Sequence, residues 1–153
     1  MDFLGIQIES IVPHRGRMLM VDRLLAGDSE GTVVSALIRP DNLFADEIGV
    51  PAWVGIEYMA QAIAAWAGIQ ALIRGEPTRI GFLLGSRRYL AHVGHFGFGD
   101  RLTIEARREL FGDNGLGMFS CRIALGDREL ANAQVSVFEP PDPGVFFEGN
   151  ANG

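Results

Sequence analysis

The segment Val50–Ile73 contains a single charged side chain, Glu57, among 24 residues. Pro51 suits the first position of a helix, where its missing N–H costs nothing, and Gly75 is a typical residue just beyond a helix end. The pattern therefore predicts one long helix from Pro51 to about Arg74. Because this helix is apolar on nearly all faces, other elements must enclose it.

Apolar and alternating runs elsewhere predict β-strands. Met18–Leu25 and Thr32–Arg39 flank the turn-forming GDSEG and predict a hairpin ahead of the helix. Four more strand-like runs follow the helix, namely RIGFLLGSRRYL, DRLTIEARREL, GMFSCRIAL and ELANAQVSVFE. Turn signals at Gly112–Gly115 and Leu125–Arg128 predict that these runs form a four-strand meander. The order of elements predicts an α+β fold, a long central helix wrapped by a curved antiparallel sheet of about five to six strands.

The length of 153 residues fits one compact domain with a sizeable core. We expect this domain to span residues 1–139. The remaining tail, residues 140–153, contains three prolines, and we expect it to be irregular.

Net charge of −6 and a pI near 5.0 argue against broad binding to nucleic acid or to an anionic membrane. All 13 basic residues are Arg, which excludes lysine Schiff-base chemistry. The single cysteine, Cys121, excludes an internal disulfide and a multi-cysteine metal site. His92 and His95 lie three residues apart without further recognisable ligands, so no metal site is predicted.

The long apolar segment is long enough to cross a bilayer, but it is rich in Ala, Gly and Gln and contains Glu57. We interpret it as the buried helix of a soluble protein. The N-terminal MDFLGIQIES has neither a basic region nor a signal-like apolar core, so a cytoplasmic location is expected.

Glu57 needs an explanation, because an ionised carboxylate is costly in apolar surroundings unless it is paired or used. One interpretation is a structural carboxyl satisfied by a hydrogen bond, for instance with Gln61 four residues along the same helix face. The other is a catalytic carboxyl. The residues by themselves leave both interpretations open.

Two motifs carry a resemblance to a known family. VPHRGRMLMVDRL (Val12–Leu24) and PAWVGIEYMAQ (Pro51–Gln61) resemble the opening LPHRxPxLLVDRV and the helix motif PGVLxxEAMAQ of the FabZ-type 3-hydroxyacyl-ACP dehydratases. GFLLGSRRYLAHVGHFGFGDRLTIEA and ELANAQVSVFE are similar to their later strands, so the likeness extends over roughly Ile8–Glu139. The whole chain looks closest to the dehydratase-like branch associated with aryl polyene biosynthesis.

The resemblance implies a hotdog fold and a dimer or higher oligomer joined through its sheets. It also implies thioester substrates on the phosphopantetheine arm of acyl carrier protein (ACP) or CoA, without a further cofactor. Dehydration needs a base for the C2 proton, an acid for the departing hydroxyl, and donors for the enolate oxygen. Glu57 matches the family's helix carboxylate and is expected to be the general acid. Ala52 matches the glycine whose backbone N–H serves the oxyanion, and Trp53 and Gln61 are expected beside the substrate.

The family's catalytic histidine, in GHFPxxPxxPG, has no counterpart here, because Asn42–Trp53 reads NLFADEIGVPAW. Three explanations stay open. Asp46 or Glu47 does the work of the base, or His14 of the PHR motif reaches the site. Alternatively, a histidine-containing hotdog subunit pairs with this chain in a heterodimer and completes the site.

An acidic chain that binds an acidic carrier protein needs a local basic patch. Arg87 and Arg88, with Arg15 and Arg17, are the candidates for this role. The alternative is an ordinary solvated strand and loop.

The sequence therefore predicts a 3-hydroxyacyl thioester dehydratase, or a dehydratase-like subunit, of fatty-acid or polyene biosynthesis. A hotdog acyl thioesterase is the alternative enzyme, with Glu57 acting on the thioester carbonyl. A catalytically incomplete partner subunit is the alternative that is not an enzyme alone. Product analysis separates the two enzymes, because one releases water and the other a free acid and thiol.

Overall fold

The computed structural model describes residues 5–77, 82–112 and 114–139. These residues form three short 3₁₀ helices, one α-helix and eight strands. In chain order these are η1 (Ile8–Ser10), η2 (Gly16–Met18), β1 (Arg23–Gly27), β2 (Gly31–Leu37), β3 (Gly49–Pro51), η3 (Ala52–Val54), α1 (Gly55–Arg74), β4 (Phe82–Ala91), β5 (His95–Gly97), β6 (Arg101–Phe111), β7 (Leu116–Leu125) and β8 (Arg128–Phe138).

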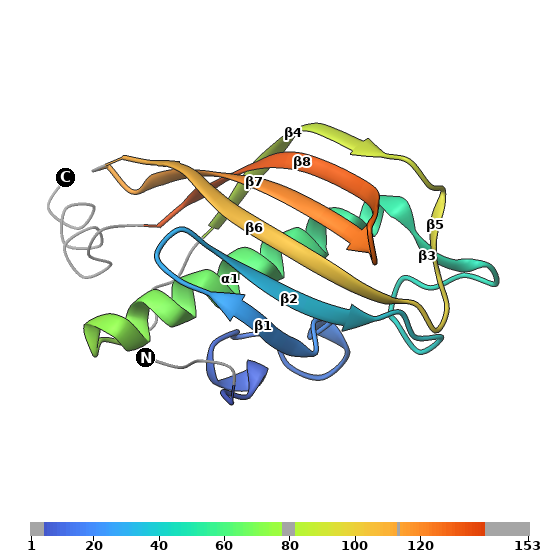
Figure 1. Ribbon diagram of the computed structural model, residues 1–153, viewed down its shortest axis with the longest axis horizontal. Helices are drawn as coiled ribbons and strands as arrows, with labels where there is room; N and C mark the ends of the chain where they lie inside the picture. Colours follow the sequence, from blue (N-terminus) through green and yellow to red (C-terminus); the bar gives the residue numbers. More distant parts are fainter. Residues whose placement is uncertain (1–4, 78–81, 113, 140–153) are drawn as a thin grey trace, which may run out of the picture.

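Six strands form one antiparallel sheet in the order β1-β2-β6-β7-β8-β4, which curves over α1 (Figure 1). This arrangement confirms the predicted α+β architecture of a long helix wrapped by a sheet of five to six strands. The predicted four-strand meander is wrong in its order, since only β6, β7 and β8 are consecutive neighbours. β4 instead pairs with β8, because the chain leaves β4 through β5 and re-enters the sheet beside β2.

Helix α1 supplies much of the core. Met59, Ala62, Ala65 and Ile69 are fully buried on it, and they pack with apolar side chains of the sheet. The helix ends at Arg74 as predicted. Gly75 adopts a left-handed conformation (φ 67°), and its N–H donates to the carbonyl of Leu72 in the last turn.

The start of the helix differs from the prediction. Pro51 is the last residue of β3, the 3₁₀ turn η3 follows it, and α1 begins only at Gly55. Pairing between β3 and β5 keeps Pro51 extended, with ψ at 142°. The short two-stranded sheet was not predicted, because three-residue strands lack a detectable periodicity.

The first strand also begins later than predicted, at Arg23 rather than Met18. The reason is tertiary. The backbone N–H groups of Met20 and Val21 donate to the side-chain oxygen of Gln61, so these residues bond to α1 instead of to a neighbouring strand. The other boundaries of the hairpin lie within two residues of the prediction, since β1 ends at Gly27 and β2 covers Gly31–Leu37.

Cys121 is buried in β7, where burial raises the pKa of its thiol to about 12, as suits a core residue. Within the described residues, no helix is both long and apolar enough to cross a bilayer. The expected irregular tail, residues 140–153, lies outside the described residues.

Replacement of Gly68 by Ala should destabilise the fold, although Ala favours helices. A Cβ at Gly68 would meet the backbone of Ile11, with the Ile11 Cα only 2.8 Å away and its carbonyl oxygen closer still. We expect a loss of about 1–3 kcal/mol in unfolding free energy, measured by urea denaturation. Gly85→Ala is the matched control, because a Cβ there meets nothing within 4 Å. Equal stability of the two variants would contradict this packing.

Candidate functional site

Glu57 lies in the first turn of α1 and faces the N-terminal segment of the chain. Its side chain is 32% exposed, so the carboxyl is at the edge of the core rather than enclosed in it. Its Oε1 accepts a hydrogen bond from Gln61 Nε2 at 3.0 Å, and His14 Nε2 lies 3.5 Å from the same oxygen. The structure therefore brings Glu57, Gln61 and His14, all three of which the sequence analysis singled out, into a single cluster.

Gln61 is fully buried and uses its whole hydrogen-bonding capacity. Besides Glu57, its Nε2 donates to the carbonyl of Met18 at 2.7 Å. Its Oε1 accepts the backbone N–H groups of Met20 (2.9 Å) and Val21 (3.3 Å). The expected hydrogen bond between Glu57 and Gln61 is present, but Gln61 chiefly attaches the N-terminal segment to α1.

His14 lies between η1 and η2, on a loop that Arg15 holds closed. The Arg15 guanidinium donates to the carbonyls of Glu9, Val12 and His14, each at 2.6 Å. His14 Nε2 points to Glu57, whereas its Nδ1 is buried without a hydrogen-bond partner among the described residues. No local pattern indicates this contact, because the two residues are 43 positions apart in the sequence.

Asp46 does not join this cluster, since no hydrogen bond or ion pair among the described residues links it to Glu57. Its Oδ2 lies 2.7 Å from His95 Nε2, and its Oδ1 accepts the N–H groups of Ile48 and Gly49. The hydrogen bond with His95, followed by these two backbone donors, lowers the pKa of Asp46 below its ordinary value. Asp46 is therefore engaged in holding its own loop against β5, which weakens its case as the missing base.

Ala52 and Trp53 form the turn that leads into α1. The Ala52 N–H donates to the carbonyl of Gly94 at 3.0 Å, so it is not the free oxyanion donor that was expected. The Ala52 carbonyl accepts the hydroxyl of Tyr89, whose pKa burial raises to about 12. Trp53 is 63% exposed and packs edge-on against Phe44, with ring centroids 5.5 Å apart.

The predicted basic residues separate into two groups. Arg15 is occupied with its own loop, and Arg17 donates to the carbonyl of Asp41 at 3.1 Å. Arg87 and Arg88 are exposed on β4, where an irregular register and a positive φ of 56° at Arg88 turn the strand. This second pair extends into solvent from β4, one of the two edge strands of the sheet.

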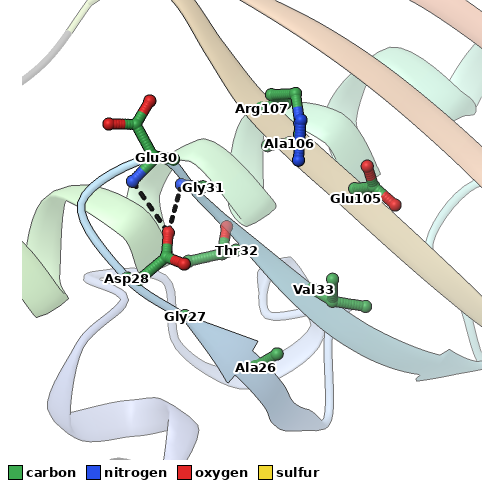
Figure 2. Close-up of a pocket in the computed structure, with 10 residues that line it drawn as sticks. All are labelled: Ala26, Gly27, Asp28, Glu30, Gly31, Thr32, Val33, Glu105, Ala106 and Arg107. Carbon is green, nitrogen blue, oxygen red and sulfur yellow. Dashed lines mark hydrogen bonds between the residues drawn. The ribbon is translucent and has the colours of Figure 1, made fainter.

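Two hollows of the described surface lie apart from Glu57. Figure 2 shows the first, of about 220 Å³, between the β1–β2 hairpin and β6. There the Asp28 carboxylate accepts the N–H groups of Glu30 and Gly31 and so fixes the hairpin turn. The second, of about 270 Å³, lies beside residues 16–22 and includes Arg17 and Arg39, both bonded to Asp41. Neither hollow is lined by Glu57, and within the described residues no group of three or more His, Cys, Asp or Glu side chains is placed to hold a metal.

Comparison with known proteins gives a consistent result. The family model described as "ApeP-like: ApeP dehydratase" matches residues 6–148. The structure resembles that of the dehydratase heterocomplex ApeI:P from Xenorhabdus doucetiae with a TM-score of 0.83 and 24% sequence identity, covering 95% of this chain and 98% of that one. No curated protein matches the chain significantly.

Weaker structural likenesses extend to other members of the same fold. The Escherichia coli PaaI protein of the phenylacetic acid degradation operon gives a TM-score of 0.60 and 14% identity, covering 75% of this chain and 80% of that one. A hypothetical thioesterase from Streptococcus pneumoniae, solved with coenzyme A, gives a TM-score of 0.57 and 14% identity, covering 76% of this chain and 84% of that one. These matches support the hotdog fold that the sequence motifs implied.

Replacement of Gln61 by Met should loosen the N-terminal segment and disturb the site. Two backbone N–H groups, of Met20 and Val21, lose their acceptor in a buried position, at a cost of about 1–3 kcal/mol for each unsatisfied group. We expect a loss of roughly 3 kcal/mol in unfolding free energy and faster amide exchange at those two residues. Gln70→Met is the control, because Gln70 lies on the same helix and makes one exposed bond to Asp28. Unchanged amide exchange at Met20 and Val21 would contradict the role assigned to Gln61.

Proposed function

Because the chain belongs to the ApeP-like dehydratase family, we propose that it is one subunit of a heteromeric dehydratase. Its substrate is a 3-hydroxyacyl thioester on the phosphopantetheine arm of acyl carrier protein or CoA, in fatty-acid or polyene-type biosynthesis. The observation that carries this proposal is the half-buried carboxyl of Glu57, held by Gln61 and His14 at the start of the central helix.

Dehydration breaks the C2–H and C3–O bonds, and the hydroxyl leaves as water. Two proton transfers are needed, one from C2 and one to the departing oxygen. A carboxyl that is reachable from solvent and fixed in orientation can perform one of them. Glu57 meets both conditions, because its side chain is 32% exposed and Gln61 fixes one of its oxygens.

The enolate oxygen that develops on the thioester requires hydrogen-bond donors. The Ala52 N–H is engaged with Gly94, so the donors must come from further along the chain. No side chain caps the start of α1 at Val54. The Gly55 N–H bonds the Ala52 carbonyl, so we assign stabilisation of the enolate oxygen to the positive end of the α1 dipole and to no single amide.

The second proton-transfer group comes, in this proposal, from a partner subunit. The loop before the helix has no histidine where the family motif has one. Asp46, in the same loop, is bonded to His95 and two backbone amides. The related structure from Xenorhabdus doucetiae is that of a dehydratase heterocomplex, which supports assembly with a different hotdog subunit.

Strand β4 is the surface that suits such a partner. It is one of the two edge strands of the six-stranded sheet, and within that sheet it pairs with β8 (Figure 1). Leu83, Leu84 and Leu90 are exposed on it, with Leu84 57% exposed. A free strand edge with exposed Leu side chains favours pairing with another sheet. Docking of a second hotdog subunit along β4 would cover these Leu side chains, and in this proposal the carrier protein meets Arg87 and Arg88 at the border between the two subunits.

Glu57→Gln should abolish most of the dehydratase activity, because glutamine is neither an acid nor a base at this position. We expect the rate to fall by at least about 100-fold, the usual contribution of a general acid–base group. The measurement is mass spectrometry of a defined 3-hydroxyacyl-ACP after incubation with the chain, with and without a histidine-containing hotdog partner encoded by the same organism. An enoyl thioester with loss of water is the expected product.

Each other outcome of that assay contradicts a defined part of the proposal. A free acid with free thiol would identify a thioesterase. Full turnover by the chain alone would remove the need for a partner. A full rate for Glu57→Gln, in conditions where the wild type is active, would exclude Glu57 from the chemistry.

Replacement of both Arg87 and Arg88 by Ala should weaken recognition of the carrier protein. We expect KM for the carrier-linked substrate to rise about 3- to 10-fold at low salt, and its dependence on ionic strength to diminish. Arg101→Ala with Arg128→Ala is the control, since both side chains are exposed elsewhere on the sheet. If KM and its salt dependence equal those of the wild type, these arginines do not bind the carrier. Gel filtration establishes that subunit assembly is intact.

A further inference from the structure

The cluster around Glu57 includes His14 Nε2, an atom that has no assigned part in the dehydration. His14 Nε2 and Gln61 Nε2 both approach Oε1 of Glu57, at 3.5 Å and 3.0 Å. The Gln61 contact is at normal hydrogen-bond distance, whereas the His14 contact is longer than a normal hydrogen bond. Within the described residues, the one hydrogen bond that reaches this carboxyl is made to Oε1 and none is made to Oε2, so the two oxygens are in different surroundings.

The orientation of the Gln61 amide is determined by its other partners. Its oxygen accepts the N–H groups of Met20 and Val21, so the nitrogen is the atom that faces Glu57 and Met18. An amide NH₂ only donates, and it therefore favours a Glu57 oxygen that bears no proton.

The position of the proton on the His14 ring follows from the burial of Nδ1. Nδ1 is buried and has no hydrogen-bond partner among the described residues. A buried N–H without an acceptor is rarer and more costly than a buried lone pair without a donor. A neutral imidazole carries one N–H, and an imidazolium would carry a second at Nδ1. The arrangement therefore favours the neutral ring with its proton on Nε2, the atom that faces Glu57.

We infer that His14 is a positioning residue that acts with Gln61 to hold Glu57 as a carboxylate, with Oε1 engaged and Oε2 free for proton transfer. This inference rests on the proposed function and specifies the role of Glu57 within it. The hydrogen bond from Gln61, with the His14 nitrogen directed at the same oxygen, suits an Oε1 that bears no proton. Glu57 is then the base of the reaction, and not the general acid that the family resemblance implied.

The chemical step is balanced with Glu57 in this role. The C2–H bond breaks, the proton passes to Glu57 Oε2, and the electron pair forms the thioester enolate. The C3–O bond then breaks as the enolate collapses to the enoyl thioester. The departing hydroxyl takes a proton from an acid of the partner subunit, an imidazolium in a histidine-containing hotdog chain, and leaves as water.

The residues around His14 fix its position beside Glu57. Arg15 fixes the loop through three backbone carbonyls, including that of His14. Ile11 and Val12, just before it in the chain, are buried in the core. Among the described residues, His14 is the one basic side chain within 4 Å of the Glu57 carboxyl. Its removal should therefore change the orientation of Glu57 without breaking an ion pair of that carboxyl with Arg.

The first experiment is ¹⁵N NMR of the histidine side chains in the full chain at neutral pH. We expect a neutral His14 with its proton on Nε2, and a change in the His14 Nε2 signal in the Glu57→Gln variant. A proton on Nδ1, an imidazolium, or an Nε2 signal that is unchanged in the Glu57→Gln variant would overturn the inference. Because this readout does not depend on turnover, it decides the role of His14 even if the dehydratase assay gives no product.

The second experiment compares His14→Ala with His14→Gln in the assembled dehydratase. The amide of glutamine can return an N–H donor to Glu57, whereas alanine cannot. We expect kcat to fall about 10-fold or more in His14→Ala with little change in KM, and to recover substantially in His14→Gln. His92→Ala is the control, because His92 pairs with Glu129 on a different part of the sheet and should leave kcat unchanged.

Circular dichroism and gel filtration establish that each variant is folded and assembled. Equal kcat in His14→Ala and wild type would overturn the inference, as would a loss that His14→Gln does not restore. These failures differ from failure of the proposed function, in which the wild type itself releases no enoyl product or Glu57→Gln retains the full rate.

Discussion

A primary amide buried out of contact with water is costly unless its donors and acceptors are all paired, and Gln61 meets this condition through groups that lie far apart in the sequence. One side of the amide bonds the backbone of Met18, Met20 and Val21, and the other bonds Glu57. The N-terminal segment is thereby attached to the central helix. The cluster that includes His14 exists because this attachment brings the loop of residues 11–15 beside the first turn of α1.

The position of Glu57 follows from the same construction. The sheet curves over α1 and buries its apolar faces, whereas Glu57, in the first turn, meets His14 of the loop between η1 and η2. A carboxyl can remain half exposed there while Gln61 and His14 hold it in place. In the heteromeric dehydratase proposed above, a second subunit completes this site. The exposed edge of β4 and the absence of a histidine from the loop before the helix are the features that support this proposal.

Much of the fold could be predicted from the sequence, because the responsible forces act locally. The long apolar run and Gly75 determined the helix and its end, and alternating runs with turn signals identified the long strands. The order of strands could not be predicted, since β4 and β6 are joined by a connection that carries the chain across the sheet. The short β3–β5 pair also escaped detection. This pairing keeps Pro51 extended and places the Ala52 N–H against the carbonyl of Gly94.

For the candidate site, the sequence by itself determined the carboxyl, its partner Gln61 four residues along the helix, and the absence of a histidine from the preceding loop. These features depend on helical spacing and on residue identity. Only the tertiary structure decided that His14 lies against Glu57, and that Asp46 bonds His95 instead. Both contacts join residues more than 40 positions apart, and a contact of that kind forms through the packing of whole elements, which leaves no periodic trace in the sequence.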